Sequence, residues 1–196
     1  IIQLQDLISS FQCLPSINIM FKDPILNKLV KKYGAPNNFK DRTEFLYEEL
    51  VESIIGQQLS GKAADTIFKR FLALYKNSKF PTPEELLETD VEKLRSAGMS
   101  YSKASYIKNI ARAFKNGDLD IKILRKMSDE DVKKELTKIK GVGNWTAEMT
   151  LIFTLKREDV FSLGDAGLRR AIKNLYNLEK DKDILKLTEK WKPKRS

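Results

Sequence analysis

The stretch 138–155, KIKGVGNWTAEMTLIFTL, places Gly141, Val142 and Gly143 between two segments of helical character. Glycines permit positive φ angles and let another molecule approach the backbone closely. A helix that begins near Asn144 starts with unpaired N–H groups, which together with the helix dipole form a site for an anion such as phosphate. The apolar run 149–155 should then anchor the turn in the core. The pattern predicts a tight helix–turn–helix, and an ordinary αα-turn with glycine caps is the alternative.

The remainder of the chain predicts further helices joined by short turns. Valine is scarce and no proline occurs between Pro83 and Pro193, which argues against a large sheet. Apolar residues recur at helical spacing in 43–59, 61–75, 80–98, 102–117, 128–139, 165–176 and 182–191. The expected helix-end residues are Pro83, Asp90, Gly98, Gly117 and Ser128. We therefore predict an all-α fold.

The residue inventory restricts the chemistry. The single cysteine, Cys13, excludes an internal disulfide, a cysteine-based zinc site and a cysteine-ligated iron–sulfur cluster within this chain. The absence of histidine leaves carboxylates, lysine, tyrosine or bound water for acid–base work. No signal peptide is recognised, and the longest apolar run is far shorter than the roughly 20 residues of a membrane span. We expect an intracellular protein.

Charge points to a class of partner. Lys and Arg number 36 against 27 for Asp and Glu, which gives a formal net charge of +9. Such an excess favours a polyanion such as nucleic acid, although many lysine-rich proteins are basic only for solubility.

Several stretches in order resemble one family. IIGQQLSGKAA, LRSAGMSYSKASYI, GVGNWTAEM, VFSLGDAGLRR and WKPKRS are similar to the helix–hairpin–helix DNA glycosylase superfamily, and most of all to its 3-methyladenine DNA glycosylase II (alkylpurine) branch. The resemblance runs from about Asp23 to the end of the chain. It implies one helical glycosylase unit over 1–196, in which two helical subdomains flank an active-site cleft. The central subdomain would be 42–155, and the second would be 1–41 plus 156–196.

The resemblance also implies a catalytic residue, Asp165. Taken alone, Asp165 is an expected N-cap, since it follows Gly164 and precedes a helix. In the superfamily the catalytic aspartate occupies this position, where a carboxylate stabilises an oxocarbenium-like sugar and orients or deprotonates the attacking water. Bifunctional relatives carry a lysine nucleophile where this chain has Trp145, which cannot form a Schiff base. Lys140 is near in sequence but precedes the glycines.

The expected substrate follows from the same inventory. A normal purine leaves poorly unless it is protonated, whereas an N3- or N7-alkylated purine already carries a positive charge and leaves as a neutral base. A carboxylate without a histidine acid therefore suits alkylated purines such as 3-methyladenine in double-stranded DNA, although a Glu or Tyr acid stays open. We expect a monofunctional enzyme.

The remaining site assignments are those that the resemblance implies. The DNA-contacting residues would be Gln58, Leu59, Ser60, Gly141, Val142, Gly143 and Thr146. Gln58, or else Leu59, would be the wedge that enters the space left by a flipped base. Trp145 and Met149 would line the base pocket, and Trp145 is equally compatible with a core position. Backbone carbonyls of Thr137, Ile139 and Val142 would hold a monovalent cation, Na⁺ or K⁺. No cofactor is expected to be required, no iron–sulfur cluster is expected, and the protein should be a monomer.

Two other functions stay open from the sequence. A glycosylase for oxidised or mismatched bases would need the lysine missing at Trp145, or often an iron–sulfur cluster that one cysteine cannot ligate. A non-catalytic helix–hairpin–helix DNA-binding module is the second, and Asp165 at the family position argues against it.

Overall fold

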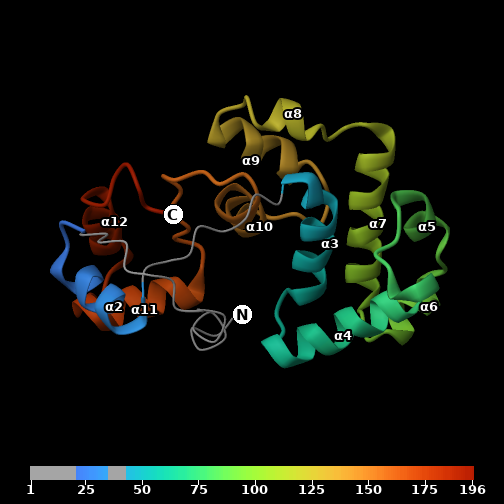
Figure 1. Cartoon of the computed structure of the whole chain (residues 1–196), viewed down its shortest axis with the longest axis horizontal. Helices are drawn as coiled ribbons and strands as arrows, with labels where there is room; N and C mark the ends of the chain where they lie inside the picture. Colours follow the sequence, from blue (N-terminus) through green and yellow to red (C-terminus); the bar gives the residue numbers. More distant parts are fainter. Residues whose placement is uncertain (1–20, 35–42) are drawn as a thin grey trace. The chain divides into compact units, whose positions relative to one another are not determined.

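Helices make up the protein in the computed structural model, which describes residues 21–34 and 43–196 (Figure 1). These residues form no strand, which confirms the all-α prediction for the described part of the chain. They divide into two units, 43–157 and 21–34 together with 158–196. Cys13 and the stretches 1–20 and 35–42 of the predicted subdomains lie outside the described residues. None of the described helices is both long and apolar enough to cross a membrane.

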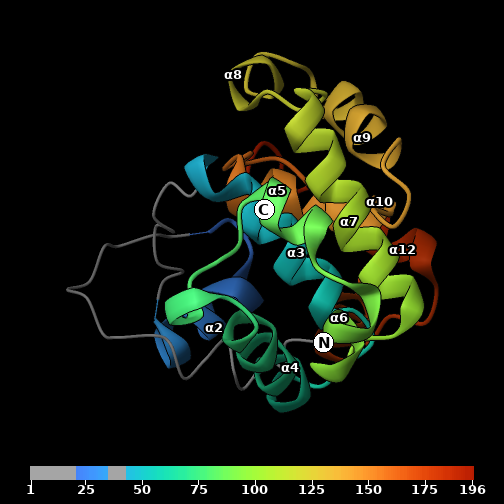
Figure 2. The same ribbon diagram turned by 90° about the vertical axis from the view of Figure 1, so that its right-hand side faces the viewer.

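The first unit is organised around its longest helix. Its elements are η1 (Thr43–Phe45), α3 (Leu46–Gly56), α4 (Gly61–Ala73), η2 (Lys76–Ser78), α5 (Pro83–Glu88), α6 (Val91–Ser96), α7 (Tyr101–Asn116), α8 (Ile121–Leu124), α9 (Asp129–Thr137), α10 (Asn144–Met149) and the π-helical turn η3 (Thr150–Thr154). Helix α7 packs against α3, α5 and α6, and Figure 2 shows it alongside α3. The core forms because α3 and α7 each bury one apolar stripe at helical spacing, Leu50 and Ile54 on α3 and Ile107 and Ile110 on α7.

Short-range signals explain where these helices begin and end. Asp90 and Ser128 accept N–H hydrogen bonds at the starts of α6 and α9, Pro83 occupies the first turn of α5, and Gly117 ends α7 at a φ of 76°, all as predicted. Thr82 and Glu85 also form a reciprocal capping box. Gly98 lies one residue beyond the C-cap of α6, with a φ of 107°. The predicted helix 128–139 ends earlier, at Thr137, and the run after the hairpin changes from α to π geometry at Thr150.

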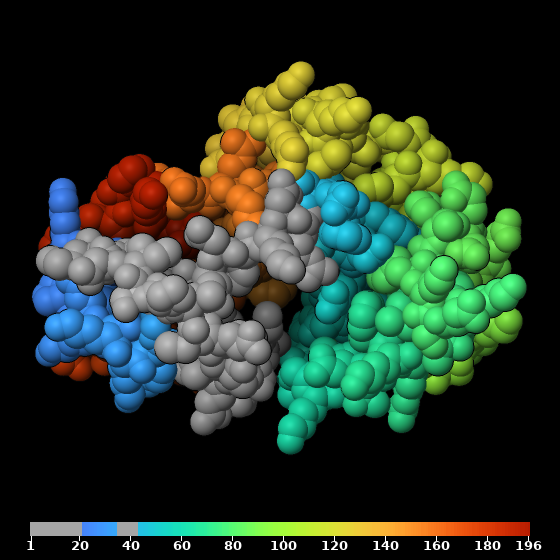
Figure 3. Space-filling view, in the orientation of Figure 1, coloured from blue at the N-terminus to red at the C-terminus, as the bar shows by residue number. Residues whose placement is uncertain are grey.

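One carboxylate connects the helices of the second unit, which are α2 (Pro24–Tyr33), α11 (Ala166–Tyr176) and α12 (Asp181–Glu189). Asp23 caps α2 by accepting the N–H groups of Ile25 and Leu26 at 2.8 and 3.3 Å. Its second oxygen accepts the Tyr176 hydroxyl at 2.9 Å and the Trp191 indole N–H at 3.0 Å. Figure 3 shows the blue surface of α2 in the same part of the unit as the red C-terminal segment. Burial opposes the charge on Asp23, but these hydrogen bonds outweigh it and lower its pKa overall.

The C-terminal residues fix the segment that leads to α11. The Arg195 guanidinium donates two hydrogen bonds to the Asp159 carboxylate, at 2.6 and 3.0 Å, and holds the pKa of that carboxyl below its usual range. The Ser196 hydroxyl accepts the Val160 N–H at 2.8 Å and donates to the Val160 carbonyl at 3.1 Å. Residues 158–160 are therefore held from both their side-chain and backbone groups.

The contacts of Asp23 predict a pH-dependent loss of stability on substitution. Asp23→Asn should lower the free energy of unfolding by about 1–2 kcal/mol at pH 7, because hydrogen bonds to a charged acceptor are stronger than neutral ones. The folded-state pKa of Asp23 lies below its ordinary value of 3.8, so this contribution is present above that value and is lost as the pH falls through the folded one. Thermal unfolding followed by circular dichroism at pH 7 and at successively lower pH below 3.8 measures both effects.

Glu179→Gln is the matched control, since it removes the same charge from an exposed position of the same unit. An equal loss in the two variants would mean that net charge, and not the Asp23 hydrogen bonds, sets the stability.

Candidate active site

Asp165 is held at the start of α11 by the backbone around it. Its Oδ1 accepts the Leu168 N–H at 2.7 Å, which confirms that Asp165 is the N-cap of this helix. A Cβ on Gly167 would lie 3.2 Å from the same oxygen, so the missing side chain leaves room for the carboxylate. The Asp165 N–H donates to the Ser162 carbonyl at 3.2 Å. The Leu168 N–H therefore directs this carboxylate, and the bond to Ser162 holds the backbone of Asp165.

A charge cluster lies one and two turns further along α11. Asp181 forms ion pairs with Lys173 at 2.8 Å and with Arg169 at 3.8 Å, and Lys173 holds the pKa of Asp181 below its usual range. The Arg169 guanidinium also donates to the Leu163 carbonyl at 3.4 Å. Arg169 thus connects α11 to the loop that precedes Asp165.

The hairpin glycines have different structural roles. Gly141 has a φ of 112°, and a Cβ there would lie 2.3 Å from the Tyr106 ring. Gly143 has a φ of −92° and nothing within 4 Å of its Cβ position. The sequence predicts both positive φ and close approach for the pair, whereas positive φ is needed only at Gly141. Gly143 is open, which is what close approach by another molecule requires.

The start of α10 carries the other hairpin residues. Gly143 is its N-cap and supplies no side-chain acceptor to the first N–H groups. Val142 and Thr146 are only 4% and 2% exposed as whole residues, so neither presents a side chain for the predicted contact with DNA. Trp145 is 37% exposed, which disfavours the core alternative, and Met149 is half-buried.

The turn after α3 presents the predicted wedge residues. Gln58 is exposed with a φ of 58°, in the left-handed region that non-glycine residues rarely adopt. Leu59 is half-buried and its N–H donates to the Gly56 carbonyl at 3.2 Å, while Ser60 is the exposed N-cap residue of α4. Of the two candidates, Gln58 has the more accessible side chain.

The sequence does not predict the contacts of two further residues of this region, Gln57 and Lys103. The Gln57 amide donates to the Gly141 carbonyl at 3.4 Å and to the Thr146 hydroxyl at 3.3 Å. The Lys103 ammonium donates to the carbonyls of Ile55 and Gln57 at 2.7 Å each. The only sequence signal was the doubled glutamine, and nothing local to Lys103 indicates its partners.

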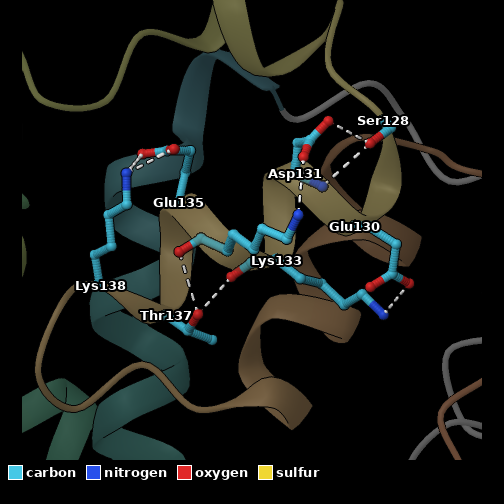
Figure 4. Close-up of polar contacts among 8 residues, drawn as sticks. Ser128, Glu130, Asp131, Lys133, Glu135, Thr137 and Lys138 are labelled. Carbon is cyan, nitrogen blue, oxygen red and sulfur yellow. Dashed lines mark hydrogen bonds and ion pairs between the residues drawn. The ribbon is translucent and has the colours of Figure 1, made fainter.

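The carbonyls predicted to hold a cation lie at the end of α9 and in the hairpin. The Ile139 carbonyl accepts the Val142 N–H at 2.9 Å, which fixes its direction. Thr137 is the last residue of α9, where carbonyls have no partner within the helix, and its hydroxyl points back to the carbonyls of Lys133 and Lys134 (Figure 4). Carbonyl oxygens are hard ligands that suit Na⁺ or K⁺. The described residues contain no group of three or more acidic, histidine or cysteine ligands.

The different roles of the two glycines predict different consequences of substitution. Gly141→Ala should lower the free energy of unfolding by at least about 2 kcal/mol, because it adds a strained φ to an overlap with the Tyr106 ring.

Gly143→Asp should fold normally, since aspartate is a favoured N-cap, yet bind duplex DNA more weakly through repulsion of phosphate. The slope of the logarithm of its DNA-binding constant against the logarithm of the salt concentration should flatten by about 0.9, for one lost phosphate contact. Thermal unfolding and salt-titrated binding isotherms measure the two effects.

Gly143→Ala is the control that separates charge from bulk at the second glycine. If Gly143→Asp kept the wild-type affinity and slope, the hairpin would be only a turn.

Comparison with known proteins places this geometry in a family. The model of the HhH-GPD superfamily base excision DNA repair proteins matches residues 51–194. The chain is 42% identical over 156 residues to "DNA-3-methyladenine glycosylase 1" of Schizosaccharomyces pombe, which covers 79% of this chain and 68% of that protein. It is 36% identical over 175 residues to "Alkylbase DNA glycosidase-like protein mag2" of the same yeast, covering 87% of this chain and 82% of that one.

A solved structure agrees with these matches. The S. pombe 3-methyladenine DNA glycosylase in complex with abasic DNA superposes with a TM-score of 0.80 at 37% identity, and the match covers 89% of this chain and 87% of that one. The chain therefore belongs to the HhH-GPD superfamily of base excision DNA repair proteins.

Proposed function

We propose that this protein is a monofunctional DNA glycosylase of base excision repair that removes alkylated purines, such as 3-methyladenine, from double-stranded DNA. The observation that carries the proposal is the Asp165 carboxylate, oriented by the Leu168 N–H at the N-terminus of α11. The sequence resemblance implies that this residue is the catalytic aspartate of the family. The names of the similar yeast glycosylases and the abasic DNA bound in the similar structure support the substrate class.

Asp165 acts on the sugar and the water in this mechanism. As the bond between the base and C1′ breaks, the deoxyribose gains oxocarbenium character, and the carboxylate stabilises that positive charge. The same carboxylate orients or deprotonates the water that adds to C1′. An alkylated purine leaves with the bonding electron pair and becomes neutral, so the reaction needs no protonation of the base.

Trp145 limits the reaction to base removal. The position where bifunctional relatives have a lysine holds an indole, which cannot attack C1′ to form a Schiff base. The product is an abasic site with an intact strand. Trp145 is exposed enough to contact a flipped base, and Met149 on the same helix is the second pocket residue.

The hairpin and the turn after α3 handle the DNA. Backbone N–H groups from Gly143 onward bind a phosphate, and Gly141 holds the hairpin in the necessary shape. Gln58 enters the space that the flipped base leaves, with Leu59 beside it and Ser60 at the start of α4. A monovalent cation coordinated by the carbonyls of Thr137, Ile139 and Val142 would add positive charge near that phosphate.

The protein works as a monomer on genomic DNA, in the nucleoid of a prokaryote or the nucleus of a eukaryote, and requires no cofactor in the reaction. These statements rest on the proposed activity and on the family.

Removing the carboxylate should abolish excision without weakening binding. Asp165→Asn keeps the size and one oxygen of the side chain but loses the charge that the transition state needs, so the single-turnover excision rate should fall at least about 100-fold. Affinity for undamaged duplex should stay within a factor of about two. Single-turnover rates and binding isotherms at one salt concentration test this.

Asp90→Asn is the matched control, because Asp90 also caps a helix, accepting the Glu92 N–H at 2.7 Å. Excision by Asp165→Asn at a near wild-type rate would move catalysis to another residue.

Product analysis tests the leaving group and the missing lysine separately. The enzyme should release 3-methyladenine, which is cationic in the nucleotide, much faster than hypoxanthine or 8-oxoguanine, and strand cleavage should appear only after alkali. Borohydride should trap no covalent complex with DNA. Mass spectrometry of released bases and gels with and without alkali measure these outcomes.

A trapped adduct would instead indicate a lysine nucleophile such as Lys140. Faster release of 8-oxoguanine would indicate a general acid and a different pocket.

A further inference from the structure

Lys103 lies where the C-terminal end of α3 meets α7. Its ammonium donates 2.7 Å hydrogen bonds to the carbonyls of Ile55 and Gln57, in and just beyond the last turn of α3. The last carbonyls of a helix lack partners within it and carry the negative end of the helix dipole, so a cation here is stabilising. Lys103 is half-buried, and its burial lowers its pKa. The ammonium is therefore bound to carbonyls of the protein and is not a free surface charge.

These two bonds act on a turn that needs support. Gln57 leaves the helix with φ and ψ of −51° and 134°, and Gln58 then adopts a φ of 58°. A left-handed conformation at a residue with a side chain is unfavourable and persists where the surroundings enforce it. The Leu59 N–H closes the turn on the Gly56 carbonyl at 3.2 Å. One of the two carbonyls that Lys103 binds, that of Gln57, therefore lies directly before the strained residue.

Gln57 provides a second connection, from the turn to the hairpin. Its amide reaches the Gly141 carbonyl and the Thr146 hydroxyl, at distances of 3.4 and 3.3 Å that are at the long end for hydrogen bonds. The same residue thus has its backbone carbonyl bound by Lys103 and its side chain directed to the hairpin.

One face of α7 supports both elements. Lys103, Tyr106 and Asn109 follow one another at intervals of three residues. Lys103 holds the turn, the Tyr106 ring lies against Gly141, and the Asn109 amide donates to the Lys140 carbonyl at 3.1 Å. Because all three come from one helix, the distance between the turn and the hairpin is set by the rigid spacing along α7.

We propose that Lys103, together with Gln57, is a positioning residue that holds the Gln58–Leu59 turn at a fixed place relative to the hairpin, so that the wedge and the phosphate-binding backbone engage one DNA duplex in register. This inference rests on the proposed base-flipping function. Lys103 contacts no substrate in this scheme, and its effect passes through the turn.

The test is Lys103→Met, which keeps the unbranched side chain but removes the charge and the donors. Single-turnover excision should slow roughly tenfold or more, as expected for lost charge-assisted hydrogen bonds. Lesions that unstack easily should be affected least, and 2-aminopurine fluorescence beside the lesion should show slower flipping. Affinity for undamaged duplex and its salt slope should be unchanged. A slope flattened by about 0.9 would identify Lys103 as a phosphate contact and overturn the proposal.

Lys108→Met is the matched control. Lys108 lies on the same helix, is also half-buried, and donates to a carbonyl near the end of another helix, that of Leu87 in α5, at 3.0 Å. It should lose comparable thermal stability but keep normal excision and flipping. Equal slowing in both variants would reduce the effect to general destabilisation and refute the positioning role.

Gln57→Met tests the second connection without changing the ammonium, and it should also slow base flipping.

Normal flipping by Lys103→Met would also refute the proposal. A measurement independent of activity separates this inference from the proposed function: amide hydrogen exchange at Leu59 should accelerate in Lys103→Met and not in Lys108→Met. A wild-type protein that excised no base would overturn the proposed function, while the exchange result would still decide whether Lys103 holds the turn.

Discussion

The first unit depends on the missing side chain at Gly141. The Tyr106 ring occupies the space that a Cβ would need, and the backbone there is in a region that other residues adopt at a cost. This contact lets the hairpin lie directly on α7. With the hairpin in this place, Asn109 bonds to Lys140 and Gln57 bonds to the hairpin. The packing at Gly141 and these hydrogen bonds together place the hairpin backbone on α7.

In the second unit the helices are connected by a charged side chain, the Asp23 carboxylate, and not by the absence of one. Asp23 satisfies the first N–H groups of α2 and at the same time receives the polar tips of Tyr176 and Trp191, so one carboxylate connects segments from both ends of the chain. Tyr176 is the last residue of α11, the helix that Asp165 caps. The orientation of the candidate catalytic carboxylate is therefore local, whereas the placement of its helix depends on a residue far away in sequence.

Features that depend on near neighbours were predictable from the sequence. The caps at Asp90, Ser128 and Asp165 involve partners two or three residues away, and side-chain chemistry at that range leaves few options. The site assignments needed the family resemblance, because Asp165 taken alone indicated only a cap.

Lys103 and Gln57 could not be predicted: their partners lie 46 or more residues away, and a lysine on an amphipathic helix ordinarily faces solvent. The π-helical turn at Thr150 was missed because its apolar run has ordinary helical composition.

Many lysines are paired within the protein, so the net charge of +9 overstates the positive charge that is available to bind DNA near the hairpin. Lys133 and Lys134 on α9, and Lys138 directly after it, each pair with a carboxylate three residues earlier, at 2.6, 3.4 and 2.6 Å (Figure 4). Exposed pairs of this kind contribute little to stability, but each sets a negative charge beside a positive one. Lys103 and Lys108 are directed to carbonyls inside the unit. The helix that leads into the hairpin therefore offers little net positive charge, although the exposed Lys140 follows it. In the proposed function, backbone N–H groups from Gly143 onward bind the phosphate. A rigid hairpin would serve that binding mode, since backbone dipoles, unlike lysine side chains, cannot adjust to a misplaced phosphate.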